Sequence, residues 1–235
     1  MTVREEPLYD LAAFADARRL ADWQFAQFER HVGPRTAEIG AGIGTFSERL
    51  LASGVEELLL IEPEEPSARI LEARFGGDRR VRVVREGLPE SPTLVRAPSS
   101  FDFLLCQNVL EHIEDDEAAV GAMAAALRPG GILGILVPGH PRLYGSVDAA
   151  YGHFRRYTTG AVAKVLTIAG LELLELRPFN LLGVPGWWVR SHGATSIDRR
   201  SLVVYEAMLR LWRPIEDRIR PRWGLSVVAL ARKPA

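Results

Sequence analysis

Short apolar runs alternate along most of the chain with segments whose apolar residues recur every three or four positions. The short runs predict strands at 36–39, 57–61, 81–84, 101–107, 132–137 and 173–176. The segments of helical spacing predict helices near 45–53, 64–75, 114–128 and 158–169. Glycines such as Gly54 and Gly170 stand where these helices should stop. This alternation predicts a Rossmann-like α/β fold, in which a parallel sheet carries helices on both faces and binds ligands at the carboxyl ends of its strands.

Two helical segments flank the alternating core. Residues 8–31 have amphipathic spacing, which predicts a helical cap that covers a sheet edge or closes over a ligand. An insertion precedes a last strand at 225–230, carries all but one of the tryptophans and contains a helix near 201–219 with one apolar face. We expect this insertion to be a cap on the core or a dimer surface; the alternatives are an acceptor-binding lid or a patch that rests on a membrane surface.

The chain should therefore form a single domain. Its predicted parts are an N-terminal helical cap, a cofactor-binding core, a helical insertion and the last strand, at 1–34, 35–180, 181–223 and 224–235. The composition, 47% hydrophobic and 25% charged over 235 residues, is that of an ordinary globular protein with one good core. A monomer or a homodimer is expected.

Charge and cysteine content exclude several classes of function. A net charge of -1 argues against a general nucleic-acid binder. The single cysteine, Cys106, excludes an internal disulfide and a cysteine-based zinc site, and its apolar neighbours predict a buried thiol. The acidic N-terminus does not resemble a signal peptide, and no apolar run approaches the length of a transmembrane span, so we expect a cytoplasmic protein.

A glycine-rich loop follows the first predicted strand. Gly40, Gly42 and Gly44 occupy alternate positions, where they allow positive φ angles and close approach of a ligand. Thr45 and Glu48 have the spacing of a capping box, which predicts that a helix starts directly after the glycines and points its positive end at the ligand.

The spacing and charge of this loop restrict what it binds. The G-x-G-x-G pattern is neither the G-x-G-x-x-G of dinucleotide sites nor a P-loop, which needs a lysine. Glu38, two residues before the first glycine, would repel a pyrophosphate but suits a cationic, amino-acid-like ligand. Glu62 ends the second strand, where α/β folds place an acid that binds ribose hydroxyls. The predicted ligand is a nucleoside that carries a positive group.

At these positions the chain resembles the class I S-adenosylmethionine-dependent methyltransferases. Glu38, Gly40, Gly42 and Gly44 match the first motif of that family, and Glu62 falls at its ribose-binding acid. The resemblance implies S-adenosyl-L-methionine as cofactor and a seven-stranded sheet whose antiparallel last strand lies next to the edge. The alternative is a tight turn without a ligand.

The resemblance also implies contacts farther along the chain. Glu86 and the small Gly87 would face the adenine, with a solvated loop charge as the alternative for Glu86. Gln107 and Asn108 would lie beside the methionine part of the cofactor. His112 is a candidate general base, against the alternative of a structural, hydrogen-bonded histidine.

The loop after the fifth strand concentrates side chains that suit binding and proton transfer. The candidates for catalysis are His153 and Tyr157, and those for substrate binding are His140, Tyr151, Arg155 and Arg156. If the segment is extended before a helix capped by Thr158 or Thr159, Arg155 and Tyr157 share one face and Arg156 points away. We therefore expect one of the two arginines to bind an anionic group, with His153 as base or hydrogen-bond donor. In the alternative, both arginines pair with Asp148 and with acids of neighbouring helices.

The function that the resemblance implies is transfer of the sulfonium methyl group to a small-molecule acceptor. The segment 152–157 resembles a subgroup found with sugar and natural-product assembly, which favours an acidic, glycosylated or phosphorylated acceptor. The protein would contribute alignment, exclusion of water and a base, and we expect no metal. The alternatives are a cyclase or lyase that uses the same cofactor and a non-catalytic cofactor-binding subunit.

Overall fold

The computed structural model describes residues 17–193 and 199–235. Its strands form one seven-stranded sheet in the order β3-β2-β1-β4-β5-β7-β6. Every strand runs in the same direction except β7, which pairs antiparallel with β5 and with the edge strand β6. This is the predicted fold class, including the antiparallel last strand next to the edge. The strands are β1 Arg35–Ile39, β2 Glu57–Ile61, β3 Val81–Val84, β4 Phe101–Gln107, β5 Leu127–Pro138, β6 Glu172–Phe179 and β7 Ser226–Arg232.

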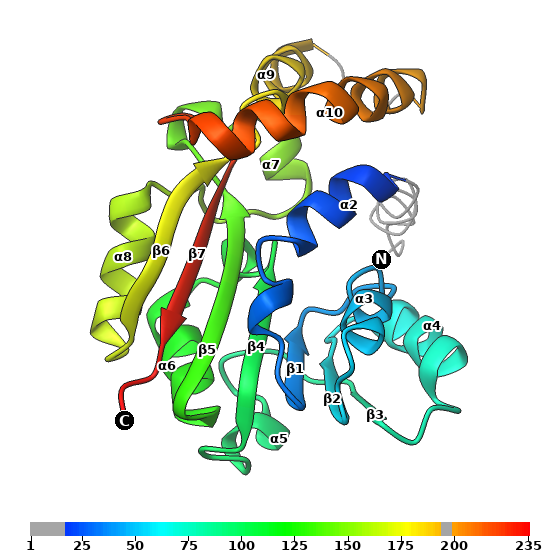
Figure 1. Cartoon of the computed structure of the whole chain (residues 1–235), viewed down its shortest axis with the longest axis vertical. Helices are drawn as coiled ribbons and strands as arrows, with labels where there is room; N and C mark the ends of the chain where they lie inside the picture. The colour runs from blue at the N-terminus through cyan, green and yellow to red at the C-terminus, as the bar shows by residue number, and fades with distance from the viewer. Residues whose placement is uncertain (1–16, 194–198) are drawn as a thin grey trace.

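Helices cover both faces of the sheet, and several gather at one end of it. Figure 1 shows α2, α7, α9 and α10 around the carboxyl ends of the parallel strands. The α-helices are α2 Arg18–Phe25, α3 Ser47–Ala52, α4 Glu65–Phe75, α5 Pro92–Val95, α6 Asp116–Ala126, α7 Ser146–Ala150, α8 Thr159–Ile168, α9 Gly183–Gly193 and α10 Arg199–Ile219. The short 3₁₀ helices in the described part of the chain are η1 Glu29–His31, η2 Leu110–His112 and η3 Pro141–Leu143. No helix among the described residues has the length and apolar character needed to cross a membrane.

The sheet separates two hydrophobic clusters because successive strand residues point to opposite faces. Leu104 and Cys106 of β4 belong to the cluster shared with α5, α6 and α8. Phe103 and Leu105 belong to the cluster shared with α2, α3, α4 and α10. Cys106 is buried, as predicted.

The start of α3 differs from the prediction. The helix begins at Ser47, its N-cap is Phe46, and no side chain caps it, so the predicted capping box of Thr45 and Glu48 is wrong. Ser47, the first residue of the helix, donates its hydroxyl to the buried carboxyl group of Glu38. The predicted cap of α8 is confirmed, since the side chain of Thr158 accepts the Ala161 N–H.

Helix α10 packs one face against the core and leaves another exposed. Leu209 is buried, and Leu202, Tyr205 and Trp212 pack on the same cluster, which confirms most of the predicted apolar face. Ile215 was predicted on that face but is 47% exposed. Other exposed apolar side chains of α10 are Val203, Val204, Met208, Leu211 and Ile219.

Two buried carboxylates of α10 bind backbone N–H groups of α2 and of the turn after β6. Glu206 accepts the N–H groups of Arg19 and Leu20, each at 2.9 Å, so that it caps α2 from a distant part of the chain. Glu216 accepts the N–H groups of Asn180 at 2.6 Å and Leu181 at 2.9 Å. It also accepts the indole N–H of Trp212, at 2.6 Å. These bonds anchor α10 to the turn that follows β6.

We predict that Glu216→Ala destabilises the protein by about 3 kcal/mol, because it leaves buried donors without an acceptor. The matched control is Glu117→Ala, which removes an exposed ion pair with Lys164 and should cost less than about 1 kcal/mol. Urea unfolding followed by circular dichroism measures both. Equal losses in the two variants would show that Glu216 does not anchor the helix.

Candidate functional site

The three glycines of the loop after β1 adopt the predicted positive φ angles: 68° at Gly40, 55° at Gly42 and 88° at Gly44. A Cβ added to Gly40 would lie 2.3 Å from a methyl carbon of Val109, and one added to Gly44 would lie 2.4 Å from the Phe75 ring. Packing within the protein therefore explains two of the three glycines without a ligand. A bound ligand is indicated by the acids around the loop, Glu38 and Glu62, and not by the glycines alone.

The carboxylate of Glu62 joins the end of β2 to the glycine loop. One of its oxygens accepts the Gly42 N–H at 2.7 Å, and the other accepts the Glu64 N–H at 3.0 Å. Burial raises the pKa of Glu62 above its ordinary value, although these two bonds oppose the shift. Because a carboxylate oxygen can accept more than one hydrogen bond, both oxygens retain the capacity to bind ribose hydroxyls.

Glu38 is buried beneath the same loop. The Ser47 hydroxyl donates to it at 2.5 Å. Burial is the main cause that raises the pKa of Glu38 to about 8, and the nearby charge of Glu62 adds to the shift. A cation beside this pair of acids would favour their charged forms. Sequence reasoning missed Ser47, whose only signal is its position directly after the loop.

Glu86 supports the start of α5. Its carboxylate accepts hydrogen bonds from the hydroxyls of Ser91 at 2.5 Å and Thr93 at 2.7 Å, and from the Thr93 N–H at 2.9 Å. Burial alone would raise the pKa of Glu86, but these bonds bring it below its ordinary value. Its side chain is therefore held by α5. Gly87 lies near the residue that follows Glu62, since an added Cβ would be 3.6 Å from Pro63.

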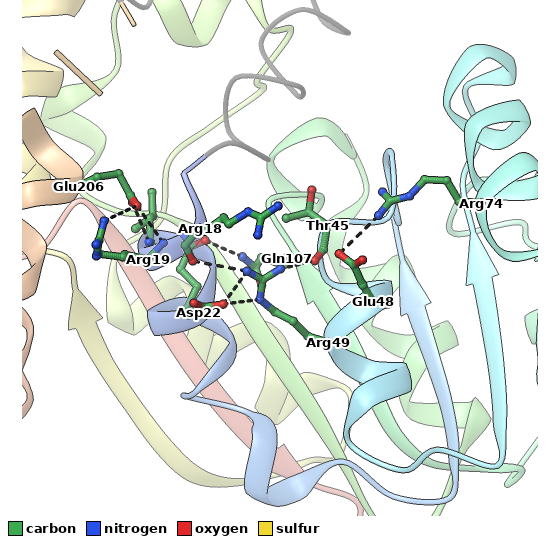
Figure 2. A network of polar contacts seen from close by, with 11 residues as sticks. Arg18, Arg19, Asp22, Thr45, Glu48, Arg49, Arg74, Gln107 and Glu206 are labelled. Atoms are coloured by element: carbon green, nitrogen blue, oxygen red, sulfur yellow. Dashed lines mark hydrogen bonds and ion pairs between the residues drawn. The ribbon is translucent and has the colours of Figure 1, made fainter. Parts of the chain in front are cut away.

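Helix α2 lies over the end of β4. Gln107 donates to the side chain of Gln24 at 3.1 Å, while its own amide oxygen is buried and has no partner among the described residues. Arg49 of α3 donates to Asp22 of α2 at 2.6 and 2.9 Å (Figure 2). Asn108 follows with a φ of 53° and an exposed side chain. Helix α2 thus packs over the carboxyl end of β4, and residues 8–16 of the predicted N-terminal cap lie outside the described residues.

A group of titratable side chains lies where the loops after β4 and β5 meet. The Nδ1 of His153 is 2.8 Å from the Asp148 carboxylate, which also accepts from Arg156 at 2.8 Å. The His112 ring meets the His153 ring edge to face, with centroids 4.6 Å apart. Glu111 is buried beside them. We call Glu111, His112 and His153 the His–Glu cluster.

Local environment shifts two members of the His–Glu cluster toward their neutral forms. Burial raises the pKa of Glu111 to about 8, and the charge of Arg156 opposes this shift. Partial burial of the ring, followed by the charge of His153, lowers the pKa of His112 to about 4, although the residue as a whole is exposed. His112 is therefore a neutral imidazole at pH 7, with a nitrogen that can accept a proton or a metal ion.

The segment before α8 has the predicted alternation. Arg155 and Tyr157 both contact the carboxylate of Asp116, at 2.9 and 2.8 Å, whereas Arg156 turns to Asp148. Both arginines thus make the ion pairs that the alternative prediction described. Burial raises the pKa of Tyr157, whose hydroxyl donates to Asp116. The structure does not favour Tyr157 as a catalytic residue, because its hydroxyl is buried and already bonded.

His140 and Tyr151 face the insertion. The His140 ring stacks on Trp223 with centroids 4.5 Å apart, and its Nε2 accepts the Gly224 N–H at 3.4 Å. The Tyr151 hydroxyl accepts from Arg190 at 3.3 Å, and its ring centroid is 6.0 Å from that of His153. Of these two residues, Tyr151 lies beside the His–Glu cluster.

Residues 37–133 match the family model described as a methyltransferase domain. A ubiquinone biosynthesis O-methyltransferase from Bordetella bronchiseptica is 32% identical over 42% of this chain and 40% of its own length. The match thus spans about two fifths of that curated relative. A solved S-adenosylmethionine-dependent methyltransferase from Mesorhizobium loti superposes with a TM-score of 0.62 at 16% identity, covering 89% of this chain and 98% of that one. The [4+2]-cyclase SpnF superposes with a TM-score of 0.59 at 19% identity, over 93% and 82% of the two chains.

We predict that Glu38 makes stability fall as pH rises. Its pKa is about 8 in the folded protein against an ordinary value of 4.5, so in this interval the folded state retains a proton that the unfolded chain has lost. Glu38→Gln should remove up to about 1.4 kcal/mol of this loss per pH unit. Urea unfolding between pH 5 and pH 8 measures the slope, and an unchanged slope in the variant would contradict the raised pKa.

Proposed function

We propose that this chain, which carries a methyltransferase domain over residues 37–133, transfers a methyl group from S-adenosyl-L-methionine to a hydroxyl oxygen of a small acidic molecule. The observation that carries the proposal is the pair of buried acids, Glu38 and Glu62, at the glycine loop on the carboxyl edge of the sheet. A nucleoside with a cationic group has the chemistry that such a pair binds.

In this proposal the cofactor extends along the carboxyl ends of β2, β1 and β4. Glu62 binds the ribose hydroxyls, and Gly87, beside Pro63, leaves room for the adenine. Glu86 contributes by holding α5 next to that position. The methionine part lies over Gly40, Gly42 and Gly44, near Glu38, whose carboxyl group favours a cationic ligand. It reaches Gln107 and Asn108 at the end of β4.

The acceptor would bind on the far side of Val109, whose methyl group packs at Gly40. Its oxygen attacks the methyl carbon, the carbon–sulfur bond breaks, and the electron pair stays on sulfur. The hydroxyl proton must leave, and the His–Glu cluster is the centre that we assign to activate this oxygen. Asp148 holds Nδ1 of His153, which leaves Nε2 free to face the acceptor.

The arginines of the loop differ in what they can offer to an anionic acceptor. The guanidinium of Arg156 is buried between Asp148 and the Trp187 ring, 4.5 Å from the ring centroid. The Arg155 side chain is 33% exposed and shares Asp116 with Tyr157. We therefore assign Arg155 to the acceptor and a supporting role to Arg156. Tyr151 and His140 would line the side of the acceptor site that faces the insertion.

The acceptor class that we favour is an acidic, glycosylated or phosphorylated metabolite, and the curated relatives act in ubiquinone biosynthesis by name. The direct test incubates the full chain with S-adenosylmethionine and a panel of nucleotide sugars, sugar phosphates and hydroxybenzoates. Acceptor-dependent S-adenosylhomocysteine supports methyl transfer. Methylthioadenosine instead would indicate lyase or cyclase chemistry on the cofactor, and binding without either product would indicate a non-catalytic subunit. The cytoplasmic location, the single domain and the monomeric or homodimeric state stay predictions.

We predict that Glu62→Gln weakens S-adenosylmethionine binding at least tenfold. The variant loses charge-assisted hydrogen bonds to the ribose worth about 1.5–3 kcal/mol. Glu64→Gln is the matched control, since it removes the same charge at an exposed position two residues away. Isothermal titration calorimetry gives both affinities. Parental affinity in Glu62→Gln would place the ribose elsewhere.

We predict that His153→Ala and Tyr157→Phe separate the two catalytic candidates. Loss of the His153 imidazole should lower kcat by a factor of about 10²–10⁴ and leave cofactor affinity unchanged. Tyr157→Phe keeps the ring and removes only a buried hydroxyl, so kcat should change little. Both are measured on the acceptor that the panel identifies, and a larger loss in Tyr157→Phe would reverse the assignment.

A further inference from the structure

The His–Glu cluster contains the donor set of a metal site. Glu111, His112 and His153 each offer one ligand atom, and these atoms all lie within 4.8 Å of one another. Two imidazole nitrogens and one carboxylate oxygen are ligands that zinc and other divalent transition metals accept. The spacing along the sequence did not predict this set, because His153 comes from a different loop than Glu111 and His112.

One oxygen of the Glu111 carboxyl group is buried without a partner in the described part of the chain, which also indicates a bound cation. Glu111 is 1% exposed, and its Oε2 has no hydrogen-bond partner among the described residues. A buried polar atom without a partner is costly, and native proteins rarely leave one unexplained. A bound cation at this position would supply the missing partner.

Both imidazoles are held by a second layer of contacts that leaves one nitrogen of each ring available. His153 uses Nδ1 toward Asp148, which is fixed in turn by Arg156. His112 hydrogen bonds to the Tyr151 backbone. A carboxylate or carbonyl partner of this kind orients most metal-binding histidines and sets their tautomer. The two loops are also joined directly, because the Phe154 N–H donates to the Glu111 carbonyl at 2.7 Å.

We infer that Glu111, His112 and His153 bind a divalent transition-metal ion, with zinc as the best match to the donor set. Ligand atoms about 2.0–2.2 Å from zinc lie about 3.4 Å apart. The three side chains would therefore converge by roughly an ångström. Glu111 and the His153 side chain are buried and His112 is exposed, so the open positions on the ion would lie on the side of His112, where an oxygen ligand would bind.

The consequence for catalysis rests on the proposed function, whereas the metal site does not. A hydroxyl of the acceptor that binds the ion becomes more acidic, loses its proton to solvent and attacks the methyl carbon as an oxyanion. Methyl transfer in general needs no metal, and none was expected from the sequence. In this protein Glu111 and the two imidazoles would hold the ion, so that His153 would act on the acceptor through the ion and not as a free base.

The test is calorimetric titration of metal-depleted full-length protein with Zn²⁺, Mn²⁺ and Mg²⁺. We expect one Zn²⁺ per chain, weaker Mn²⁺ binding and the weakest for Mg²⁺, which prefers oxygen ligands. Glu111→Gln, which keeps the side-chain volume, and the surface change His112→Ala should each weaken Zn²⁺ binding at least about tenfold. The matched control, His31→Ala, removes a histidine of η1 and should bind Zn²⁺ like the parent. Cobalt(II) added in place of zinc should give visible absorption bands that the two ligand variants lose.

Absence of Zn²⁺ binding to the parent, or parental affinity in both ligand variants with parental melting curves, would overturn the metal site. The metal site and the methyl transfer can fail separately. Stoichiometric Zn²⁺ binding in a protein that releases no S-adenosylhomocysteine would keep the site and refute the proposed function. Turnover that is equal with and without Zn²⁺ would keep the site and refute its role in activating the acceptor.

Discussion

The hydrogen bond from the Gly42 N–H to the Glu62 carboxylate fixes the arrangement on which the candidate site depends. Ile39 and Ile61 are register partners at the ends of β1 and β2, so the two chains leave the sheet side by side. The N–H groups of Gly40 and Ala41 both donate to the Ile61 carbonyl, at 2.8 and 3.1 Å. Three consecutive amides of the glycine loop are thus tied to the end of β2. This tie places two acids, Glu38 and Glu62, close enough for the charge of one to shift the pKa of the other.

Helix α2 extends this constraint across the edge of the sheet. Glu206 of α10 holds its first turn, and Arg49 of α3 holds Asp22 in its middle (Figure 2). Gln24 near its end meets Gln107 of β4. The helix therefore connects the insertion with the glycine loop. In the proposed function this arrangement shields the cofactor from water while the sulfonium group reacts.

The sequence allowed the sheet to be predicted closely but not the polar contacts at its edge. The strands 57–61, 81–84 and 101–107 end where they were predicted, because an apolar run with β-rich residues is a local signal. The capping box of Thr45 and Glu48 does not form, and Ser47 at the start of the helix instead bonds to Glu38 of the preceding strand, a contact between elements that no local motif encodes. Glu86 is held by Ser91 and Thr93 at the start of α5, a contact that depends on how the intervening loop turns. Glu111 and His153 lie close together because the loops after β4 and β5 pack against each other. The spacing of residues within either loop does not predict this contact.

In the proposed function, the glycine loop and the two acids form the site of an adenosyl cofactor. A crystal structure of the full chain grown with S-adenosylhomocysteine tests it most directly. We expect the ribose hydroxyls to lie within hydrogen-bond distance of the Glu62 carboxylate, and the amino-acid part to lie over the glycine loop, directed toward Gln107. A nucleoside bound elsewhere, or a fully occupied crystal form in which Glu62 contacts only the Gly42 and Glu64 amides, would contradict it.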